Sequence, residues 1–206
     1  MVIVAYIVMC LIGYIMGCSN MAYYLAQRKG VNMFAKGSGN PGASNAVLLM
    51  GWRAGALVAV HDIGKAVLAV GLARLLFPGV AGISETAGVA CVLGHIFPVF
   101  QKFRGGKGFA SYIGMMLMLN WKIGLLILLA VALITMISDY LVLGTTFTVV
   151  SLPIFLFVTS AHWIALVAVC LASCVIIYKH KENYIRIVKG TEIGLRSAMK
   201  GEHKVK

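Results

Sequence analysis

Three clusters of polar and glycine residues carry the side chains that could do chemistry in this sequence. The first is Gly37–Asn45, which holds three glycines, two serines, two asparagines and one proline. Small side chains and free backbone N–H groups suit the close approach of an oxyanion. Ser38 lies between two glycines, which leaves its hydroxyl accessible, and Asn40 and Asn45 supply hydrogen-bond donors and acceptors. We interpret this stretch as a binding loop; the alternative is an ordinary flexible turn.

The second cluster is a short glycine-rich stretch, Gly105–Gly108, directly before an apolar segment. Glycines ahead of a helix expose N–H groups where the helix dipole is positive, and Lys107 adds a full positive charge. The pattern predicts a phosphate site made by Gly105, Gly106, Lys107 and Gly108. It is not a P-loop, because no Ser or Thr follows the lysine and the upstream glycine is missing. The alternative is structural: glycines for tight helix packing and a lysine that sets topology.

The third cluster lies where the last apolar segment ends. His180 and Asn183 are spaced i, i+3, which places both on one face of a helix. Glu192 follows shortly afterwards and is expected to pair with a basic residue of another loop. A histidine so placed is a candidate to orient a reacting hydroxyl or accept its proton. The alternative is a solvated or capping histidine at an interface.

The apolar character of the chain dictates the elements that must position these clusters. Hydrophobic residues make up 61% of the sequence, charged residues only 12%, and the mean hydropathy is +0.94, which excludes a soluble domain. Seven apolar segments approach the length of a membrane span: Val2–Ala26, Ala54–Phe77, Thr86–Phe100, Phe109–Asn120, Ile123–Ser138, Tyr140–Val158 and Trp163–Tyr178. The fourth suits a half-depth helix sheltered by its neighbours. We predict an all-α polytopic membrane protein of about seven transmembrane helices, forming one domain over residues 1–206.

The basic residues set the predicted orientation. They flank the first and third loops and the tail: Arg28, Lys29, Lys36, Arg53, Lys102, Arg104, Lys107 and eight Lys or Arg from Lys179 onward. The loops Pro78–Glu85 and Ser160–His162 contain none. The amino terminus is therefore expected outside, and the basic tail 179–206 and all three clusters on the cytoplasmic side. The net charge of +12 fits anionic lipid or a phosphorylated substrate, whereas no nucleic-acid-binding module is present in the sequence.

Several polar residues within the apolar segments are expected to be structural. Asp62 and Lys65 are spaced i, i+3, as in an ion pair that faces the interior of a helix bundle. His95, ahead of a Phe-Pro pair, is expected to be a buried residue at a helix end. The five cysteines all lie in apolar segments, which argues against a disulfide framework or a zinc site. The sequence requires no metal and no organic cofactor.

Taken together, the three clusters resemble the motifs of a known family. Gly37–Asn45, the stretch from Gly94 through Gly108, and the stretch from His180 through Glu192 are similar to the three motifs of the bacterial PlsY family, in the same order. Asp62 and Lys65 also match an Asp-x-x-Lys found there. PlsY proteins are acyl-phosphate:glycerol-3-phosphate acyltransferases of phospholipid synthesis.

The resemblance implies a seven-span fold, a cytoplasmic active site in the bacterial inner membrane, acyl phosphate as donor and lysophosphatidate as product. By the same resemblance, Ser38 matches the essential serine, and Lys107 belongs to the phosphate-binding loop. His180 and Asn183 match the essential pair of the third motif, and Glu192 its structural glutamate.

The sequence departs from the family pattern at two positions. Leu48 stands where the family normally has an arginine, and Val142 where it usually has a serine. Both family residues are associated with the phosphate of the acceptor, so one guanidinium and one hydroxyl are lost. Arg53, as a phosphate ligand, and Thr145 are the candidates to compensate. The donor half of the site is kept, and another polyol or polyol-phosphate acceptor stays open as an alternative.

The resulting hypothesis is a monomeric membrane acyltransferase acting on acyl phosphate and glycerol 3-phosphate. Lys107 and its loop would hold a phosphate, and Ser38, Asn40 and Asn183 would position the acceptor and the carbonyl. His180 would orient the acceptor hydroxyl or take its proton. A covalent acyl-Ser38 intermediate is an alternative. So is a function of another class, a transporter or flippase-like binder of a phosphorylated lipid precursor.

Overall fold

The computed structural model describes residues 1–159 and 161–200, and the side chains of 1–159 and 161–198. Over these residues the regular structure is entirely helical. The α-helices are α1 Val2–Cys18, α2 Met21–Arg28, α3 Ala43–Met50, α4 Trp52–Leu76, α5 Ile83–Ile96, α6 Phe109–Leu119, α7 Trp121–Ser138, α8 Leu141–Val158, α9 Trp163–Lys179, α10 Lys181–Val188 and α11 Leu195–Lys200. A 3₁₀ turn, η1, covers Val99–Gln101. The prediction of an all-α polytopic membrane protein is confirmed.

Within the described residues, five helical stretches are long and apolar enough to cross a membrane: Val2–Arg28, Trp52–Leu76, Ile83–Gln101, Trp121–Ser138 and Leu141–Val158. A sixth is formed if α9 and α10, which bend by 43° at their junction, count as one span. The fourth predicted segment is α6, with 11 residues. At 1.5 Å per residue it is about 16 Å long, roughly half the thickness of the hydrocarbon core. It therefore fits the expected half-depth helix. The orientation stays a prediction.

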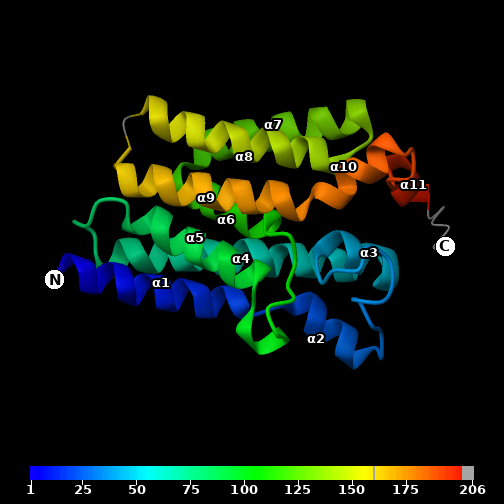
Figure 1. Cartoon of the computed structure of the whole chain (residues 1–206), viewed down its shortest axis with the longest axis horizontal. Helices are drawn as coiled ribbons and strands as arrows, with labels where there is room; N and C mark the ends of the chain where they lie inside the picture. Colours follow the sequence, from blue (N-terminus) through cyan, green and yellow to red (C-terminus); the bar gives the residue numbers. More distant parts are fainter. Residues whose placement is uncertain (160, 201–206) are drawn as a thin grey trace.

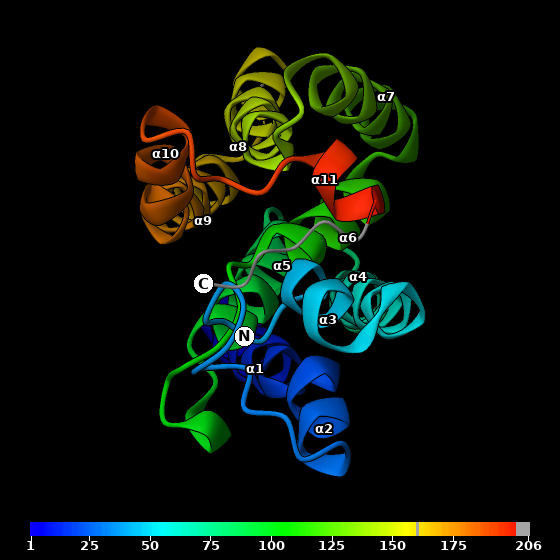
Figure 2. The ribbon, with the colours of Figure 1, turned by 90° about the vertical axis from the view of Figure 1, so that its right-hand side faces the viewer.

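The long helices run side by side along the molecule, and α3, α10 and α11 gather at the end where the described chain finishes (Figure 1). The amino terminus lies at the opposite end (Figure 1). Seen from the end, α6 lies between the group formed by α1, α4 and α5 and the group formed by α7, α8 and α9 (Figure 2). The first and third clusters thus occupy one end of the bundle.

Helix α6 is held in the middle of the bundle by the largest buried core. Tyr112, Met115 and Met116 of α6 are buried against apolar residues of α4, α5, α8 and α9. The Tyr112 hydroxyl is 2.8 Å from the Ser173 Oγ of α9, so its polar end is also satisfied. A firmly seated α6 fixes the direction of the glycine-rich loop that leads into it.

Helices α1 and α5 approach each other closely because glycines face backbone across their contact. A Cβ at Gly17 of α1 would lie 2.1 Å from the carbonyl oxygen of Cys91, and one at Gly94 of α5 would lie 2.1 Å from that of Tyr14. A membrane offers little hydrophobic drive for helix association, so such close packing supplies the attraction. This contact fixes the position of α5 against α1. It thereby fixes the point from which the loop after α5 starts.

Replacing Gly17 with Ala tests this packing. The added methyl must push two backbones apart, at a cost of about 1–3 kcal/mol, so we expect the apparent midpoint of thermal unfolding in detergent to fall by several degrees. Gly64→Ala in α4 is the matched control, because its Cβ would have no neighbour within 4 Å. Equal midpoints for the Gly17→Ala variant and the wild type would contradict the packing argument.

Candidate active site

Asn45 organises the first loop from beneath. Its side chain is fully buried, and its Oδ1 accepts a hydrogen bond of 2.9 Å from the Ser38 N–H. Its Nδ2 donates to the carbonyl oxygens of Met33 at 3.0 Å, Lys36 at 3.3 Å and Asn40 at 2.9 Å. The sequence indicates a ligand-binding side chain here, but the amide is committed to the loop itself. We therefore assign Asn45 to shaping the loop rather than to contacting a ligand.

Ser38 and Asn40 lie on the more open side of the same loop, and both are half-buried. The Asn40 Nδ2 donates to the Ser38 Oγ at 3.1 Å. This bond orients the hydroxyl while leaving its hydrogen free to donate. The pair can therefore still donate to a ligand, and its role in binding stays a prediction.

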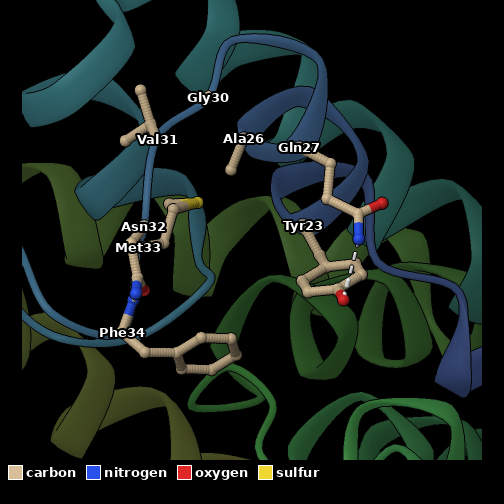
Figure 3. A pocket seen from close by; sticks show the side chains of 8 residues that line it. All are labelled: Tyr23, Ala26, Gln27, Gly30, Val31, Asn32, Met33 and Phe34. Atoms are coloured by element: carbon tan, nitrogen blue, oxygen red, sulfur yellow. Dashed lines mark hydrogen bonds between the residues drawn. The ribbon is translucent and has the colours of Figure 1, made fainter.

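A cavity of about 420 Å³ lies beside the first loop, between α2 and the chain that follows it. Its lining residues are Tyr23, Ala26, Gln27, Gly30, Val31, Asn32, Met33 and Phe34 (Figure 3). The predicted site residues are not among them. The Phe34 ring nevertheless connects this region to the second cluster, because the Arg104 guanidinium lies 4.7 Å from its centroid. No pattern in the sequence predicts this cation–π contact.

The glycine-rich loop differs from the expectation that its amides face a phosphate. The Gly105 N–H donates to the Ile96 carbonyl and the Gly106 N–H to the His95 carbonyl, both at 3.1 Å. These bonds satisfy carbonyls at the end of α5. A Cβ at Gly105 would lie 2.0 Å from the His95 carbonyl oxygen. For these two glycines the packing alternative therefore explains the sequence, and their amides are occupied.

Gly108 has a different role in the same loop. It is the N-cap of α6 and adopts the left-handed conformation, with φ of 90°. A Cβ there would be 2.7 Å from the Ile96 Cδ1 as well as strained. Gly108 thus lets the chain turn sharply into α6, so that Lys107 stands directly ahead of the positive end of that helix.

Lys107 brings the second and third clusters together. Its Nζ donates to the Asn183 Oδ1 of α10. The Asn183 Nδ2 in turn donates to the Glu192 Oε1 at 2.5 Å, and the other Glu192 oxygen accepts from the Arg186 Nε at 2.6 Å. Glu192 therefore fixes the amide of Asn183 with its oxygen toward the ammonium. The prediction that Glu192 pairs with a basic residue of another loop is wrong, because its ion-pair partner is Arg186 of α10, six residues earlier in the same segment.

The positive charge of Lys107 has no direct counter-ion among the described residues. The ion pairs within 4 Å in that part of the chain are centred on Asp62 and on Glu192 with Arg186. Burial lowers the pKa of Lys107 to about 8, with a further contribution from the Arg186 guanidinium. Its other charged neighbours are Glu192, Lys179 and Glu182. A half-buried cation in this situation is suited to receive an anion.

His180 is buried and held as a neutral base. Its Nδ1 lies 2.8 Å from the Ile176 carbonyl oxygen, which can only accept, so the proton is on Nδ1 and Nε2 is left with its lone pair. Burial lowers the pKa of His180 to about 4, and the charge of Lys107 acts in the same direction. At neutral pH the ring can therefore accept a hydrogen bond or a proton at Nε2.

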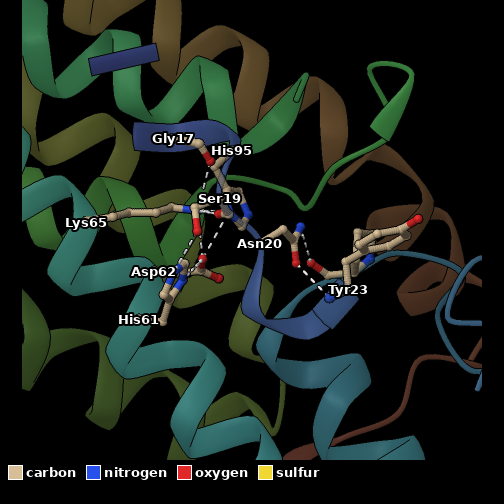
Figure 4. A network of polar contacts seen from close by, with 9 residues as sticks. Gly17, Ser19, Asn20, Tyr23, His61, Asp62, Lys65 and His95 are labelled. Carbon is tan, nitrogen blue, oxygen red and sulfur yellow. Dashed lines mark hydrogen bonds and ion pairs between the residues drawn. The ribbon is translucent and has the colours of Figure 1, made fainter. Parts of the chain in front are cut away.

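A buried polar network lies beneath both loops (Figure 4). The Lys65 Nζ contacts the Asp62 Oδ1 at 2.8 Å and the His95 Nδ1 at 2.9 Å. It also donates to the carbonyls of Gly17 at 3.0 Å and Ser19 at 2.7 Å, at the end of α1. The network joins α1, α4 and α5, as a structural ion pair should.

Three further residues, Ser19, Asn20 and His61, extend this network; of these, sequence reasoning noted only His61, next to Asp62. The Ser19 Oγ is 3.0 Å from the His61 Nε2, and the His61 Nδ1 is 3.4 Å from the Asp62 Oδ1. Buried Asn20 caps α2 through Tyr23 and donates to the Pro41 carbonyl of the first loop at 3.3 Å. The network is thereby tied to the first loop at Asn20 and to the second at His95.

Arg53 and Thr145, the candidates to compensate for the missing arginine and serine, make their recorded contacts outside the three clusters. Arg53 is exposed, with its guanidinium 5.9 Å from the centroid of the Trp52 ring beside it. Thr145 is buried, and its hydroxyl donates to the Leu141 carbonyl at 3.2 Å within α8. Val142 is likewise buried, and Leu48 is half-buried in α3. The prediction that Arg53 binds phosphate therefore gains no support from its position.

Comparison with known proteins agrees with this arrangement. Residues 7–190 match the family model described as glycerol-3-phosphate acyltransferase. The chain is 34% identical over 202 residues to glycerol-3-phosphate acyltransferase 1 of Oceanobacillus iheyensis, covering 93% of this chain and 96% of the relative. It is 35% identical over 197 residues to the glycerol-3-phosphate acyltransferase of Clostridioides difficile, with the same coverage.

The fold is similar to solved structures of PlsY, an integral membrane glycerol 3-phosphate acyltransferase. The glycerol 3-phosphate form superposes with a TM-score of 0.88 at 29% identity, covering 95% of this chain and 98% of the other. The lysophosphatidic acid form gives 0.82 at 30% identity, covering 92% and 94%. Because the family match, the relatives and the fold agree over nearly the whole length, the chain belongs to the glycerol-3-phosphate acyltransferase family.

Proposed function

We propose that this protein transfers a fatty acyl group from acyl phosphate to glycerol 3-phosphate, giving lysophosphatidate and inorganic phosphate. The observation that carries the proposal is Lys107, a half-buried cation of the second cluster that has no direct counter-ion among the described residues and that donates to Asn183 of the third cluster. The relatives named as glycerol-3-phosphate acyltransferases support the same reaction. The solved forms of PlsY named for glycerol 3-phosphate and lysophosphatidic acid support the acceptor and the product.

The reaction requires mainly positioning and charge stabilisation. The acceptor hydroxyl oxygen forms a bond to the acyl carbonyl carbon, and the bond from that carbon to the phosphate oxygen breaks, so that phosphate leaves with its electron pair. Phosphate is a good leaving group, and orientation and preorganised charge supply most of the acceleration. In our proposal Lys107 binds the phosphate of a substrate, and the neutral His180 Nε2 orients the acceptor hydroxyl or takes its proton.

Ser38, Asn40 and Asn183 complete the proposed site by hydrogen bonding. Ser38 and Asn40 position the acceptor or the carbonyl, and Asn183 orients the ammonium of Lys107. A covalent acyl-Ser38 intermediate is disfavoured, because the described residues show no hydrogen bond between Ser38 and a base. Direct transfer from donor to acceptor is the simpler course.

We place the reaction at the cytoplasmic face of the bacterial inner membrane. The first and third clusters lie at the end of the bundle that the positive-inside rule assigns to the cytoplasm (Figure 1). We also propose that the protein acts as a monomer with a single domain, because the contact between the second and third clusters forms within one chain. The basic residues around this end favour anionic substrates and lipid head groups.

Product analysis tests the proposed reaction. Purified protein is mixed with palmitoyl phosphate and, separately, glycerol 3-phosphate, glycerol and other polyol phosphates, and products are identified by mass spectrometry. We expect acylation of glycerol 3-phosphate with release of phosphate. Acylation of another polyol alone would mean that Leu48 and Val142 mark a changed acceptor. Absence of any acylated product would contradict the acyltransferase function and leave a transporter as the alternative.

Lys107→Met removes the charge while keeping the length of the side chain. If Lys107 binds a substrate phosphate, the loss of a charged hydrogen bond costs about 1.5–3 kcal/mol, so the KM for that substrate should rise roughly 10- to 150-fold. Lys102→Met is the matched control, because Lys102 belongs to the same loop and is exposed. A folded Lys107→Met variant with wild-type kinetics would show that the lysine serves topology alone.

A further inference from the structure

The segment after α10 crosses the end of the bundle and is pinned at both ends. Figure 2 shows it running from α10 past the end of α8 to α11. We define the strap as residues 191–196. Near its start, Glu192 belongs to the chain of hydrogen bonds to Lys107, and at its end Arg196 contacts the turn between α7 and α8. It therefore connects the candidate site to a turn that has no direct part in it.

The first end of the strap is fixed by α10. The backbone N–H groups of Thr191 and Glu192 both donate to the Arg186 carbonyl, at 2.8 and 3.2 Å. The Glu192 carboxylate is shared between the Asn183 amide and the Arg186 guanidinium. The orientation of Asn183 toward Lys107 thus depends on where the strap places Glu192.

The second end is fixed by Asp139. The Leu195 N–H donates to the Asp139 carbonyl at 2.7 Å, and the Arg196 N–H donates to the Asp139 Oδ1 at 2.8 Å. The Arg196 guanidinium also donates to the Met136 carbonyl at 3.0 Å. The approach is so close that a Cβ at Gly194 would lie 1.9 Å from the Asp139 Oδ2. Asp139 itself ends α7 with a φ of 70°.

The short distance along the chain makes this anchor effective. Only Ile193 and Gly194 separate Glu192 from the anchored Leu195. An extended chain advances at most about 3.6 Å per residue, so the anchor confines Glu192 to a small region. Without the anchor at Asp139, the position of the Glu192 carboxylate is less restricted. The Asn183 amide can then turn its NH₂ toward the ammonium of Lys107, so that two hydrogen-bond donors face each other.

We propose that Asp139 is a positioning residue, which acts through the strap and Glu192 to keep the amide oxygen of Asn183 on Lys107. This inference rests on the proposed function, because its effect is measured on the KM of the substrate whose phosphate Lys107 binds. Asp139 does not contact the substrate. Its influence passes through backbone hydrogen bonds to the strap.

The test compares Asp139→Ala with Asp139→Asn in the full-length protein. The alanine variant loses the acceptor for the Arg196 N–H, whereas the asparagine oxygen can still accept it. We expect Asp139→Ala to raise the KM for the phosphorylated substrate by about three- to tenfold, with kcat less affected, and to move the alkaline loss of activity to lower pH. Asp139→Asn should stay close to the wild type.

Pairing with Glu192→Ala identifies the route. If Asp139 acts through Glu192, Asp139→Ala should raise KM little further in the Glu192→Ala background. The same fold increase in both backgrounds would overturn the proposal. So would a folded Asp139→Ala variant whose KM and alkaline midpoint match the wild type, because a purely structural role lowers only thermal stability.

Arg196→Met is the second variant, in case Asp139→Ala fails to fold. It removes the guanidinium contact with the Met136 carbonyl and leaves the α7–α8 turn intact. We expect KM to rise less than in Asp139→Ala, and trypsin to cleave faster at Lys189 than in the wild type. An unchanged KM together with faster cleavage would overturn the proposal. Failure of the wild type to acylate any acceptor would instead contradict the proposed function, so the two failures are distinguishable.

Discussion

The buried ammonium of Lys65 is the constraint on which the rest of the site depends. A charge inside a helix bundle is costly unless it is fully hydrogen-bonded, and Lys65 binds the Asp62 carboxylate, the His95 ring and two carbonyls at the end of α1. These bonds join α1, α4 and α5 at the level of the end of α1. They also fix the two places where the site loops attach, since Asn20 holds the first loop and His95 holds the glycine-rich loop.

Lys107 is a second cation beside a helix end, and its surroundings differ from those of Lys65. Both lysines lie beside a helix end, but Lys65 has a carboxylate at 2.8 Å, whereas the one hydrogen-bond partner of the Lys107 ammonium in the described part of the chain is the neutral oxygen of Asn183. Among the described residues, one charge is thus paired with a carboxylate, and in our proposal the other attracts an anion. Because Glu192 is occupied by Asn183 and Arg186, it orients the site without neutralising Lys107 directly.

The sequence predicts the all-helical membrane fold and its apolar segments, because hydrophobicity is a local property of the chain. The half-depth α6 and the Asp62–Lys65 pair followed from segment length and i, i+3 spacing. The roles of Asn45, Gly105 and Gly106 did not, because they depend on carbonyls presented by other parts of the fold. Asp139 was equally hidden, since its partners in the strap are more than fifty residues away along the chain.

The pH dependence of KM tests most directly whether the charge of Lys107 binds substrate phosphate. Its pKa is about 8, so the charge is present below that pH and lost above it, whereas His180, with a pKa of about 4, stays neutral throughout the range. KM for each substrate would be measured from pH 6.5 to about 9.5 in the wild type and in Lys107→Arg, whose guanidinium keeps its charge. We predict that KM for one substrate rises about tenfold per pH unit above pH 8 in the wild type only. A flat KM in the wild type, or the same rise in Lys107→Arg, would contradict the account.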